Sequence, residues 1–411
     1  MLKRISVQQL TVGMYLREFC GSWMEHPFWR TSFVITDAHD IRRILASSIT
    51  QVWIDCAKGA DVGPGEAVVS TTESDALVDA ELHQEEVAAR PVERIPAAAE
   101  YAHAADICAK AKRTVIAIFR EARMGRAIDT VGAEALVEEI FDSVGRNTGS
   151  LISLVRLKTV GDFTYMHSVA VCALMIALAR RLGLDHEQTC TAGLAGLLHD
   201  LGKATLPKEL LDKPGQLSDS EFSLVKRHPE AGIRMLRDCG IEGTVLDVCL
   251  NHHARRDGSG YPNPLKGDEI SLFAGMAAVC DVYDAITSNR PYKRGWDPAE
   301  SMRKMAEWTS GHFDPKIFHA FVKCIGIFPI GSLVLLSSGR LGVVVEQSAT
   351  SLLKPRVKTF FSTKLNARIK PEIVDLSDPA CQEALESSED PTKWQVPDLN
   401  ELWSGLPGTP W

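Results

Sequence analysis

The feature that most constrains the fold is a stretch of helical periodicity that runs from residue 104 to residue 325. Within it, apolar side chains recur at i, i+3 and i+4, which is the spacing of one buried helical face. The clearest windows are 109–120, 133–144, 167–181, 187–198, 220–238, 245–252, 272–286 and 298–307. We therefore expect one mainly α-helical domain over residues 104–326.

The N-terminal part of the chain has a different pattern. Residues 1–58 alternate short apolar stretches with turn residues. Residues 33–35 and 52–54 are rich in β-branched and aromatic side chains, which are typical of strands, and residues 40–47 show a short helical pattern. This combination predicts a small α/β module.

The C-terminal part, residues 327–411, also departs from helical spacing. A β-hairpin is expected over residues 332–346 around Ser338 and Gly339, with a further strand over 358–361. The last 35 residues are interpreted as an extended tail. The predicted fold class is thus multidomain and mainly α, with the small α/β module before the helices and a short β-rich extension after them.

The acidic charge of the chain is concentrated in one segment. Residues 61–100 hold ten acidic side chains against Arg90 and Arg94, so this segment alone carries the formal net charge of −8 of the whole chain. It lacks aromatic residues and is rich in Ala, Glu and Pro, and we expect an acidic flexible linker over residues 59–103. The remaining residues sum to zero, which argues against duplex nucleic acid as a general partner.

Cysteine usage and hydropathy bear on the compartment. The ten cysteines form no C-x-x-C pair, so we expect free thiols in a reducing environment rather than disulfides or a cysteine–zinc site. The longest apolar run, residues 169–179, is too short to span a bilayer, and the N-terminus lacks the apolar core of a signal peptide. The expectation is a cytoplasmic protein without a membrane span.

Five of the twelve histidines, together with two aspartates, stand at or inside predicted helices in a pattern that suits a metal centre. They are His167, His199, Asp200, His228, His252, His253 and Asp281. Neutral imidazole and carboxylate suit borderline divalent metals such as iron, manganese, nickel or zinc. One carboxylate can bridge two ions, and two ions can share a hydroxide that attacks phosphorus in line. His252 and His253 can both contribute only if their helix ends there, because neighbouring helical side chains point in different directions.

Taken singly, such residues are more often ordinary core side chains than metal ligands. The motifs around them therefore decide between the two interpretations. The segment 199–203 reads His-Asp-Leu-Gly-Lys and the segment 257–262 reads Asp-Gly-Ser-Gly-Tyr-Pro. These are the HD-x-GK and DG-x-GYP signatures, and further blocks fit the same family in order and spacing at 165–168, 213–217, 228–232, 281–285 and 290–293. The helical part of the chain therefore resembles an HD-GYP domain, a subgroup of the HD phosphohydrolases.

The resemblance implies an all-helical phosphodiesterase that hydrolyses the bacterial messenger cyclic di-GMP, to pGpG and/or GMP, by a metal-bridging hydroxide. It implies two ligand sets, with Asp200 as the bridge between them: His167, His199 and Asp281 for one ion, and His228, His252 and His253 for the other. Beside the catalytic Asp200, Lys203 would face the phosphate, where its charge offsets charge that develops in the transition state. Arg290 and Lys293 would contact substrate phosphates, although a solvated pair at a helix end is the alternative.

Two positions depart from the family pattern. HD-GYP members that bind three metals share a glutamate four residues before the first histidine. In this chain that position is Phe163, whose side chain cannot bind a metal. We therefore expect two divalent ions, iron in the first place, with manganese, nickel or zinc as alternatives. The histidine pair is usually followed by glutamate, whereas this chain has Ala254, and such a change affects the groups that support metal ligands.

Two further regions are interpreted through the resemblance. Gly260, Tyr261 and Pro262 lie in a loop whose counterparts have been linked to GGDEF domains, the synthases of cyclic di-GMP, so the loop either docks such a partner or lines the active site. The N-terminal module, through residues 9–15 and 52–55, resembles an uncharacterised domain often found before HD-GYP domains.

Two alternatives to a cyclic di-GMP phosphodiesterase stay open. One is a degenerate HD-GYP protein that serves as a messenger receptor or protein-interaction module. The other is a phosphodiesterase for a different cyclic dinucleotide, since base selectivity depends on the shape of the pocket. The complete set of candidate ligands between His167 and Asp281 favours an enzyme over a receptor.

Overall fold

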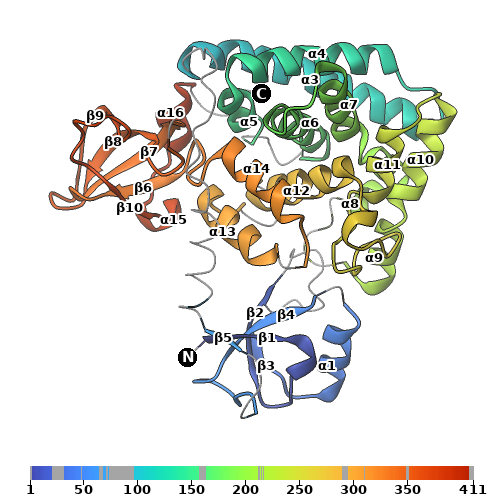
Figure 1. Cartoon of the computed structure of the whole chain (residues 1–411), viewed down its shortest axis with the longest axis horizontal. Helices are drawn as coiled ribbons and strands as arrows, with labels where there is room; N and C mark the ends of the chain where they lie inside the picture. Colours follow the sequence, from blue (N-terminus) through green and yellow to red (C-terminus); the bar gives the residue numbers. More distant parts are fainter. Residues whose placement is uncertain are drawn as a thin grey trace.

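The computed structural model has three parts that follow one another along the chain: an N-terminal α/β module, a helical domain and a β-rich C-terminal extension (Figure 1). The predicted fold class, mainly α with a small sheet towards each end, is confirmed. The structure describes residues 2–20, 32–47, 49–63, 68–70, 73, 97–156, 163–211, 213, 215, 217–288, 295–309, 311–348 and 351–406.

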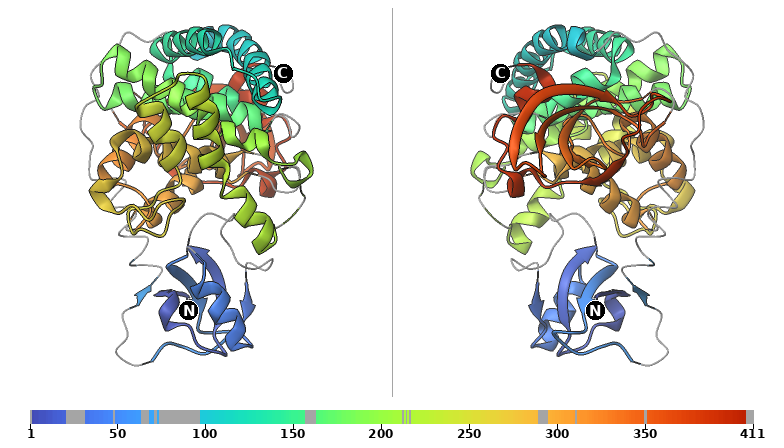
Figure 2. Two further views of the ribbon diagram at one scale, coloured as in Figure 1. Left: turned by 90° about the vertical axis from the view of Figure 1, so that its right-hand side faces the viewer. Right: turned by 90° about the vertical axis from the view of Figure 1, so that its left-hand side faces the viewer.

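The N-terminal module is an antiparallel five-stranded sheet that packs against helix α1 (Ala38–Leu45). Its strands, in the spatial order β3-β2-β4-β1-β5, are β1 (Leu2–Ser6), β2 (Tyr15–Cys20), β3 (Phe33–Val34), β4 (Gln51–Asp55) and β5 (Val69–Ser70). The module has a core of its own, and Figure 2 shows it set off below the helices. Lys304 of the helical domain reaches it, with its Nζ 3.2 Å from Oε2 of Glu18.

The helical domain surrounds one almost entirely apolar helix, α6. Its helices are α3 (Ala97–Arg123), α4 (Thr130–Arg146), α5 (Thr148–Val155), α6 (Phe163–Arg181), α7 (His186–Leu198), α8 (Lys208–Leu211), α9 (Asp219–Val225), α10 (His228–Asp238), α11 (Thr244–Asn251), α12 (Leu272–Thr287), α13 (Pro298–Trp308) and α14 (Pro315–Ile325). Helices α3, α4, α5, α7, α12 and α14 all contact α6. The apolar run of residues 169–179 is thus the centre of the core. Among the described residues, no helix has the length and apolar character to cross a bilayer.

The helical domain begins earlier than the sequence predicts. Helix α3 starts at Ala97, so residues 97–103 are helical and do not belong to a linker. The reason is a buried ion pair: Glu100, which the composition assigns to the acidic segment, lies 2.9 Å from Arg146 Nη2 and accepts a hydrogen bond from Ser143. The carboxylate therefore anchors α3 to α4.

The single helix predicted over residues 220–238 is wrong, because two helices, α9 and α10, occupy that range. Pro229 stands in the first turn of α10, where its missing N–H group has no cost, whereas it would break a continuous helix. As a result His228 is the first residue of α10 and not an interior one. Helix α6, which contains His167, also starts earlier than the predicted window of residues 167–181, at Phe163.

The C-terminal extension is a second antiparallel five-stranded sheet, and its core is continuous with that of the helical domain. The spatial order is β10-β6-β7-β8-β9, with β6 (Leu333–Leu336), β7 (Arg340–Glu346), β8 (Arg356–Ser362), β9 (Ala367–Asp375) and β10 (Leu385–Ser388). The expected hairpin and third strand are present. The predicted extended tail is wrong, because this part of the chain folds back against the rest of the protein as β10, α15 (Pro391–Trp394) and α16 (Leu399–Ser404). Trp403 of α16 is buried, with its ring edge-on to Tyr101 of α3.

One close backbone contact positions the segment that carries the HD-x-GK motif. Residues Leu201–Thr205 form a short 3-10 helix, η4, that packs directly on α10. A Cβ atom on Gly202 would lie 1.9 Å from the carbonyl oxygen of His228, and one on Gly232 would lie 2.6 Å from Sγ of Cys249. These two glycines let η4, α10 and α11 approach one another, and so bring Asp200 next to His228.

We expect Gly202→Ala to destabilise the fold by about 1–3 kcal/mol or more, because the added methyl group meets backbone atoms that cannot move aside. Urea unfolding, followed by circular dichroism, measures the change. Gly145→Ala in α4 is the matched control, since the atoms nearest to its methyl group would belong to the guanidinium of Arg180, the far end of a flexible side chain, at 3.3–3.5 Å. Equal midpoints for Gly202→Ala and the wild type would contradict the close packing.

Candidate metal centre

The seven side chains predicted to bind metal converge in the helical domain from five helices. His167 lies in α6, and Asp281 in α12. His199 caps the C-terminus of α7, with Asp200 next in the chain, and His228 begins α10. His252 caps the C-terminus of α11. The helix therefore ends at the histidine pair, which is the condition under which both His252 and His253 can face one site.

The first group consists of His167, His199 and Asp281, whose ligand atoms all lie within 4.8 Å of one another. His167 Nε2 is 2.9 Å from Asp281 Oδ1. All three side chains are at most 5% exposed. Nε2 of His199 is buried and has no hydrogen-bond partner among the described residues.

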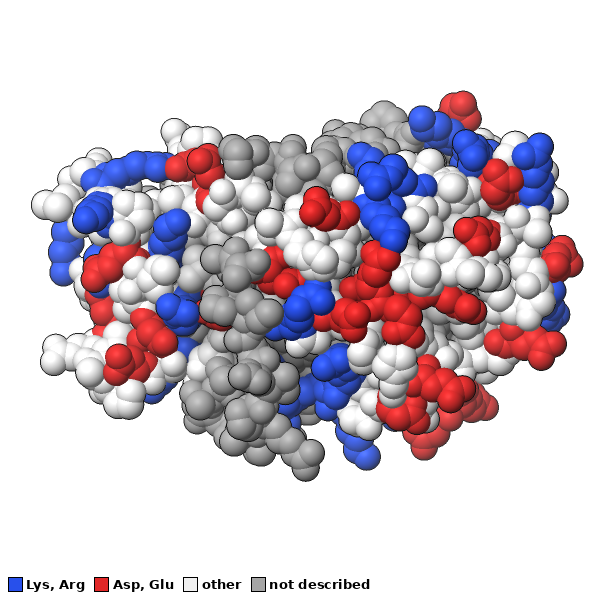
Figure 3. All heavy atoms as spheres, turned by 90° about the horizontal axis from the view of Figure 1, so that it is seen from above, with Lys and Arg blue, Asp and Glu red and all other residues white. Residues whose placement is uncertain are grey.

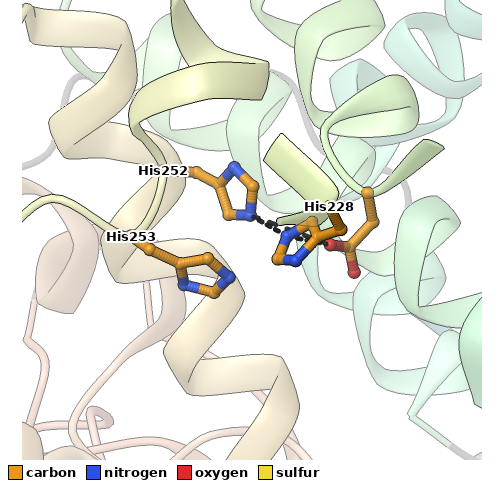
Figure 4. Close-up of side chains that lie close together, drawn as sticks. His228, His252 and His253 are labelled. Atoms are coloured by element: carbon orange, nitrogen blue, oxygen red, sulfur yellow. Dashed lines mark hydrogen bonds and ion pairs between the residues drawn. The ribbon is translucent and has the colours of Figure 1, made fainter. Parts of the chain in front are cut away.

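The second group consists of Asp200, His228, His252 and His253, again with ligand atoms within 4.8 Å of one another. Figure 4 shows the three imidazoles turned toward one another from α10 and from the end of α11. His228 Nε2 lies 3.2 Å from both Asp200 Oδ1 and His252 Nε2. The other oxygen of Asp200 lies 3.6 Å from His167 Nε2, so this carboxylate stands between the two groups.

Backbone carbonyls fix the orientation of three of these imidazoles. Nδ1 of His199 donates to the carbonyl of Gly196, that of His228 to Val225, and that of His252 to Val248 and Cys249. An Nδ1–H donor leaves the lone pair on Nε2. The Nε2 atoms of all three rings therefore point their lone pairs into the centre.

The charge states are those that metal ligands need. Burial, reinforced by the neighbouring histidines, lowers the pKa of His252 to about 3, and burial also lowers the pKa of His228 and His253. Burial alone would raise the pKa of Asp200, but Lys203 and His199 outweigh it and hold the pKa well below the usual range. At neutral pH His228, His252 and His253 are thus neutral beside an ionised Asp200, a combination that suits a divalent metal.

The donor atoms of the site have the arrangement that a bound cation would require. Lone pairs of buried imidazole nitrogens face one another and face carboxylate oxygens at 3.2–3.7 Å. Such an arrangement is unfavourable unless positive charge lies between the atoms. Lys203, whose Nζ contacts Oδ2 of Asp200, supplies one positive charge at the edge of the site. The residues present therefore fit divalent metal ions.

Asp284 is a site residue that the prediction missed. Its Oδ2 lies 2.7 Å from Nδ1 of His167, and Ser288 donates to its Oδ1 at 3.2 Å. Burial lowers the pKa of His167, but the carboxylates of Asp281 and Asp284 outweigh burial and raise it. The signal was present in the sequence, because Asp281 and Asp284 are three residues apart and share one face of a helix.

The loop with the GYP sequence lies against the histidine pair. The ring of Tyr261 stacks on His253 with centroids 4.6 Å apart, and the ammonium of Lys226 lies 5.3 Å from the centroid of the same ring. A Cβ atom on Gly260 would be 2.4 Å from the carbonyl oxygen of His253, so only glycine permits the loop to turn back here. Pro262, which follows Tyr261 through a cis peptide bond, is half-buried.

The remaining predicted positions are less informative. Arg290 and Lys293 lie outside the described residues, so their role as phosphate contacts stays a prediction. The side chain of Phe163, on which the expectation of two metals depends, is also outside the described part. Ala254 is buried and lines a pocket of about 300 Å³ together with His312 and Ile317.

Comparison with known proteins decides the family. Residues 2–133 match the family described as a domain of unknown function (DUF3391), and residues 150–317 match the HD domain. Over 408 residues, 99% of this chain and 96% of the relative, the chain is 52% identical to cyclic di-GMP phosphodiesterase PA4108 of Pseudomonas aeruginosa. This chain belongs to the HD-GYP family.

Two more distant HD-GYP relatives match only the helical part. The first is 3'3'-cGAMP-specific phosphodiesterase 1 of Vibrio cholerae, 38% identical over 39% of this chain and 38% of the relative. The second is the cyclic di-GMP phosphodiesterase response regulator RpfG of Xanthomonas campestris, 32% identical over 46% of this chain and 50% of the relative. The predicted resemblance is confirmed for both the helical domain and the N-terminal module.

We expect Asp284→Asn to weaken metal binding by about 10–100-fold, because it removes the carboxylate that orients His167 and makes it more basic. Competition with a chromophoric chelator measures the affinity. Asp238→Asn, an exposed aspartate of α10, is the control and should bind like the wild type. An unchanged affinity in Asp284→Asn would show that His167 does not depend on this contact.

Proposed function

We propose that this chain is a metal-dependent phosphodiesterase that hydrolyses cyclic di-GMP. The observation that carries the proposal is the buried convergence of two histidine–aspartate groups with Asp200 between them. The identity of 52% over nearly the full chain to a relative named as a cyclic di-GMP phosphodiesterase supports the same substrate. The product, pGpG or GMP, is left to experiment.

The proposed cofactor is a pair of divalent metal ions, with iron as the first choice and manganese, nickel or zinc as alternatives. His167, His199 and Asp281 would hold one ion, His228, His252 and His253 the other, and Asp200 would bind both. When bound, such ions supply a nucleophile from water at neutral pH and stabilise charge on phosphoryl oxygens. The two groups of ligand atoms, each spanning less than 4.8 Å, support this division.

The protein side chains have separable tasks in this proposal. The backbone-anchored histidines keep the ligand atoms fixed before substrate arrives, which lowers the reorganisation that the reaction requires. Lys203 is 20% exposed, whereas Asp200 is 1% exposed, so the ammonium stands between the buried centre and solvent. From there it can contact a substrate phosphate while it keeps Asp200 ionised.

A second candidate substrate is 3'3'-cGAMP. The helical domain is 38% identical to a relative named as specific for that dinucleotide, and the phosphate chemistry would be the same. The full-length match favours cyclic di-GMP, because it covers the N-terminal module as well. A degenerate receptor is disfavoured, since all seven candidate ligands are present and converge.

The test is turnover of both dinucleotides by the purified full chain, with Asp200→Ala as the inactive control. We expect cyclic di-GMP to be hydrolysed with the higher kcat/KM, and Asp200→Ala to lose metal and activity together. Elemental analysis of anaerobically purified protein counts the ions. A chain that takes up no divalent metal, or that binds cyclic di-GMP without turnover, would overturn the proposal.

For Lys203→Ala we expect kcat to fall by about 10²–10³-fold, because one fixed charge that stabilises the transition state is removed. Lys203→Arg, which keeps the charge, should recover part of the loss. Steady-state kinetics and metal content are measured on the same preparations. If kcat stays at the wild-type value in the alanine variant, Lys203 has a structural role only.

The loop of Gly260, Tyr261 and Pro262 has two proposed roles. Its exposed residues Asn263 and Pro264 are free to meet a GGDEF-domain partner, which is the role that the resemblance suggests. The stacking of Tyr261 on His253 instead supports a role in the catalytic pocket, and we favour this one.

Tyr261→Ala separates the two roles. We expect it to lower turnover or raise KM, because His253 loses the ring that holds its orientation, while pull-down of a GGDEF partner is unaffected. The reverse result, weak pull-down with normal turnover, would favour docking and contradict the pocket role.

The compartment is proposed from the cysteines. All ten are free thiols, as the sequence predicts, and four of them are fully buried. Free thiols are the usual state in a reducing cytoplasm, which is where we place this protein.

A further inference from the structure

A second group of ligand-type side chains lies on the surface between α4 and α7. It consists of Glu138 of α4 with His186 and Cys190 of α7, and we refer to it as the α4–α7 site. Nε2 of His186 is 3.2 Å from Oε2 of Glu138, and Sγ of Cys190 is 3.4 Å from Oε1 of Glu138 and 3.8 Å from Nε2 of His186. None of the three belongs to the candidate metal centre.

These separations are close to those of ligands on one tetrahedral ion. At bond lengths of about 2.0–2.3 Å, the sulfur, nitrogen and oxygen ligands of a zinc ion lie about 3.3–3.6 Å apart. The three side chains thus need to move by only a few tenths of an ångström. Thiolate, imidazole and carboxylate together also suit a borderline divalent metal rather than calcium or magnesium.

The scaffold holds two of the ligands in place. His186 is the first residue of α7, which Asp185 caps by accepting a hydrogen bond from the amide of Gln188. Cys190 follows one helical turn later, so both side chains lie on the same face. The ring of Phe141 packs edge-on against His186 with centroids 4.7 Å apart, which restricts the imidazole.

The surroundings are acidic. Glu134, Glu138 and Asp142 are exposed along α4, and Figure 3 shows clusters of acidic side chains on the face that carries α3 and α4. Burial, together with Glu138 and Asp142, raises the pKa of the Cys190 thiol to about 12. Without a cation the thiol therefore keeps its proton and donates a hydrogen bond to Glu138, and a bound metal would displace that proton.

We infer that Glu138, His186 and Cys190 bind one divalent cation of the zinc class, with solvent in the remaining position. The ion joins α4 to the first turn of α7. Helix α7 ends at Leu198, directly before His199 and Asp200, so the ion fixes the far end of the helix that presents these two residues. The inference is independent of the substrate of the catalytic centre.

The test uses Co²⁺ as a spectroscopic substitute for Zn²⁺, titrated into the full chain. A thiolate bound to Co²⁺ absorbs in the near ultraviolet, and the candidate metal centre contains no cysteine, so this absorption reports on the α4–α7 site. We expect the wild type to develop the band and both Cys190→Ser and Glu138→Gln to lose or weaken it. Cys239→Ser, a partly exposed cysteine at the end of α10, is the matched control and should keep the band.

A second measurement does not depend on the stability of any variant. Zn²⁺ should slow the alkylation of Cys190 by iodoacetamide in the wild type, measured by mass spectrometry of the peptide, and should leave the labelling of Cys239 unchanged. The inference is overturned if the wild type shows no thiolate–cobalt band, if Cys190→Ser retains the band, or if Zn²⁺ leaves the labelling rate of Cys190 as it was.

Discussion

Lone pairs of buried imidazoles that face carboxylate oxygens are stable only when positive charge lies between them, and the helical domain is arranged around such a point. Five helices place candidate ligand atoms around this point. Backbone carbonyls at the ends of α7, α9 and α11 accept hydrogen bonds from Nδ1 of the histidines, so that Nε2 faces inward. The apolar helix α6 supplies the rigid core against which these ends pack. The groups that end the helices also hold the candidate ligands in place, so the proposed metal binding would be coupled to folding.

The residue types in the two motifs follow from the geometry of the helix ends around the site. His199 and Asp200 are adjacent and must both face the site, which is possible only where a helix ends. Gly202 is required by the backbone of α10, and Gly260 by the backbone around His253, rather than by the chemistry. Pro229 starts α10 so that His228 stands at its N-terminus. The glycines of both signatures thus encode close packing, and His199 and Asp200 of the first signature encode candidate ligands.

The sequence predicted a mainly helical fold with a small sheet towards each end, and its seven candidate ligands converge in the structure, because periodicity and motif spacing are local properties. It did not predict what depends on contacts between distant residues. Glu100 has the composition of a linker but is buried by Arg146, and Trp403 belongs to a segment of tail-like composition but packs on Tyr101. Asp284 was missed because a second carboxylate on a helix is common, and only the fold places it on Nδ1 of His167.

The exposure of the ligands indicates how a substrate reaches the centre. His167, His199, His228 and His252 are at most 3% exposed, whereas His253 is 13% and Lys203 is 20% exposed. The more exposed edge of the site is therefore the side of Lys203 and His253, where Tyr261 stacks on His253 and the ammonium of Lys226 lies over the Tyr261 ring. Two ammonium groups at this edge would attract a substrate that carries two phosphodiester monoanions, whereas the protein as a whole, with a net charge of −8, would not. In the proposed function, attraction of an anionic substrate to an acidic protein would thus depend on the local placement of these two lysines.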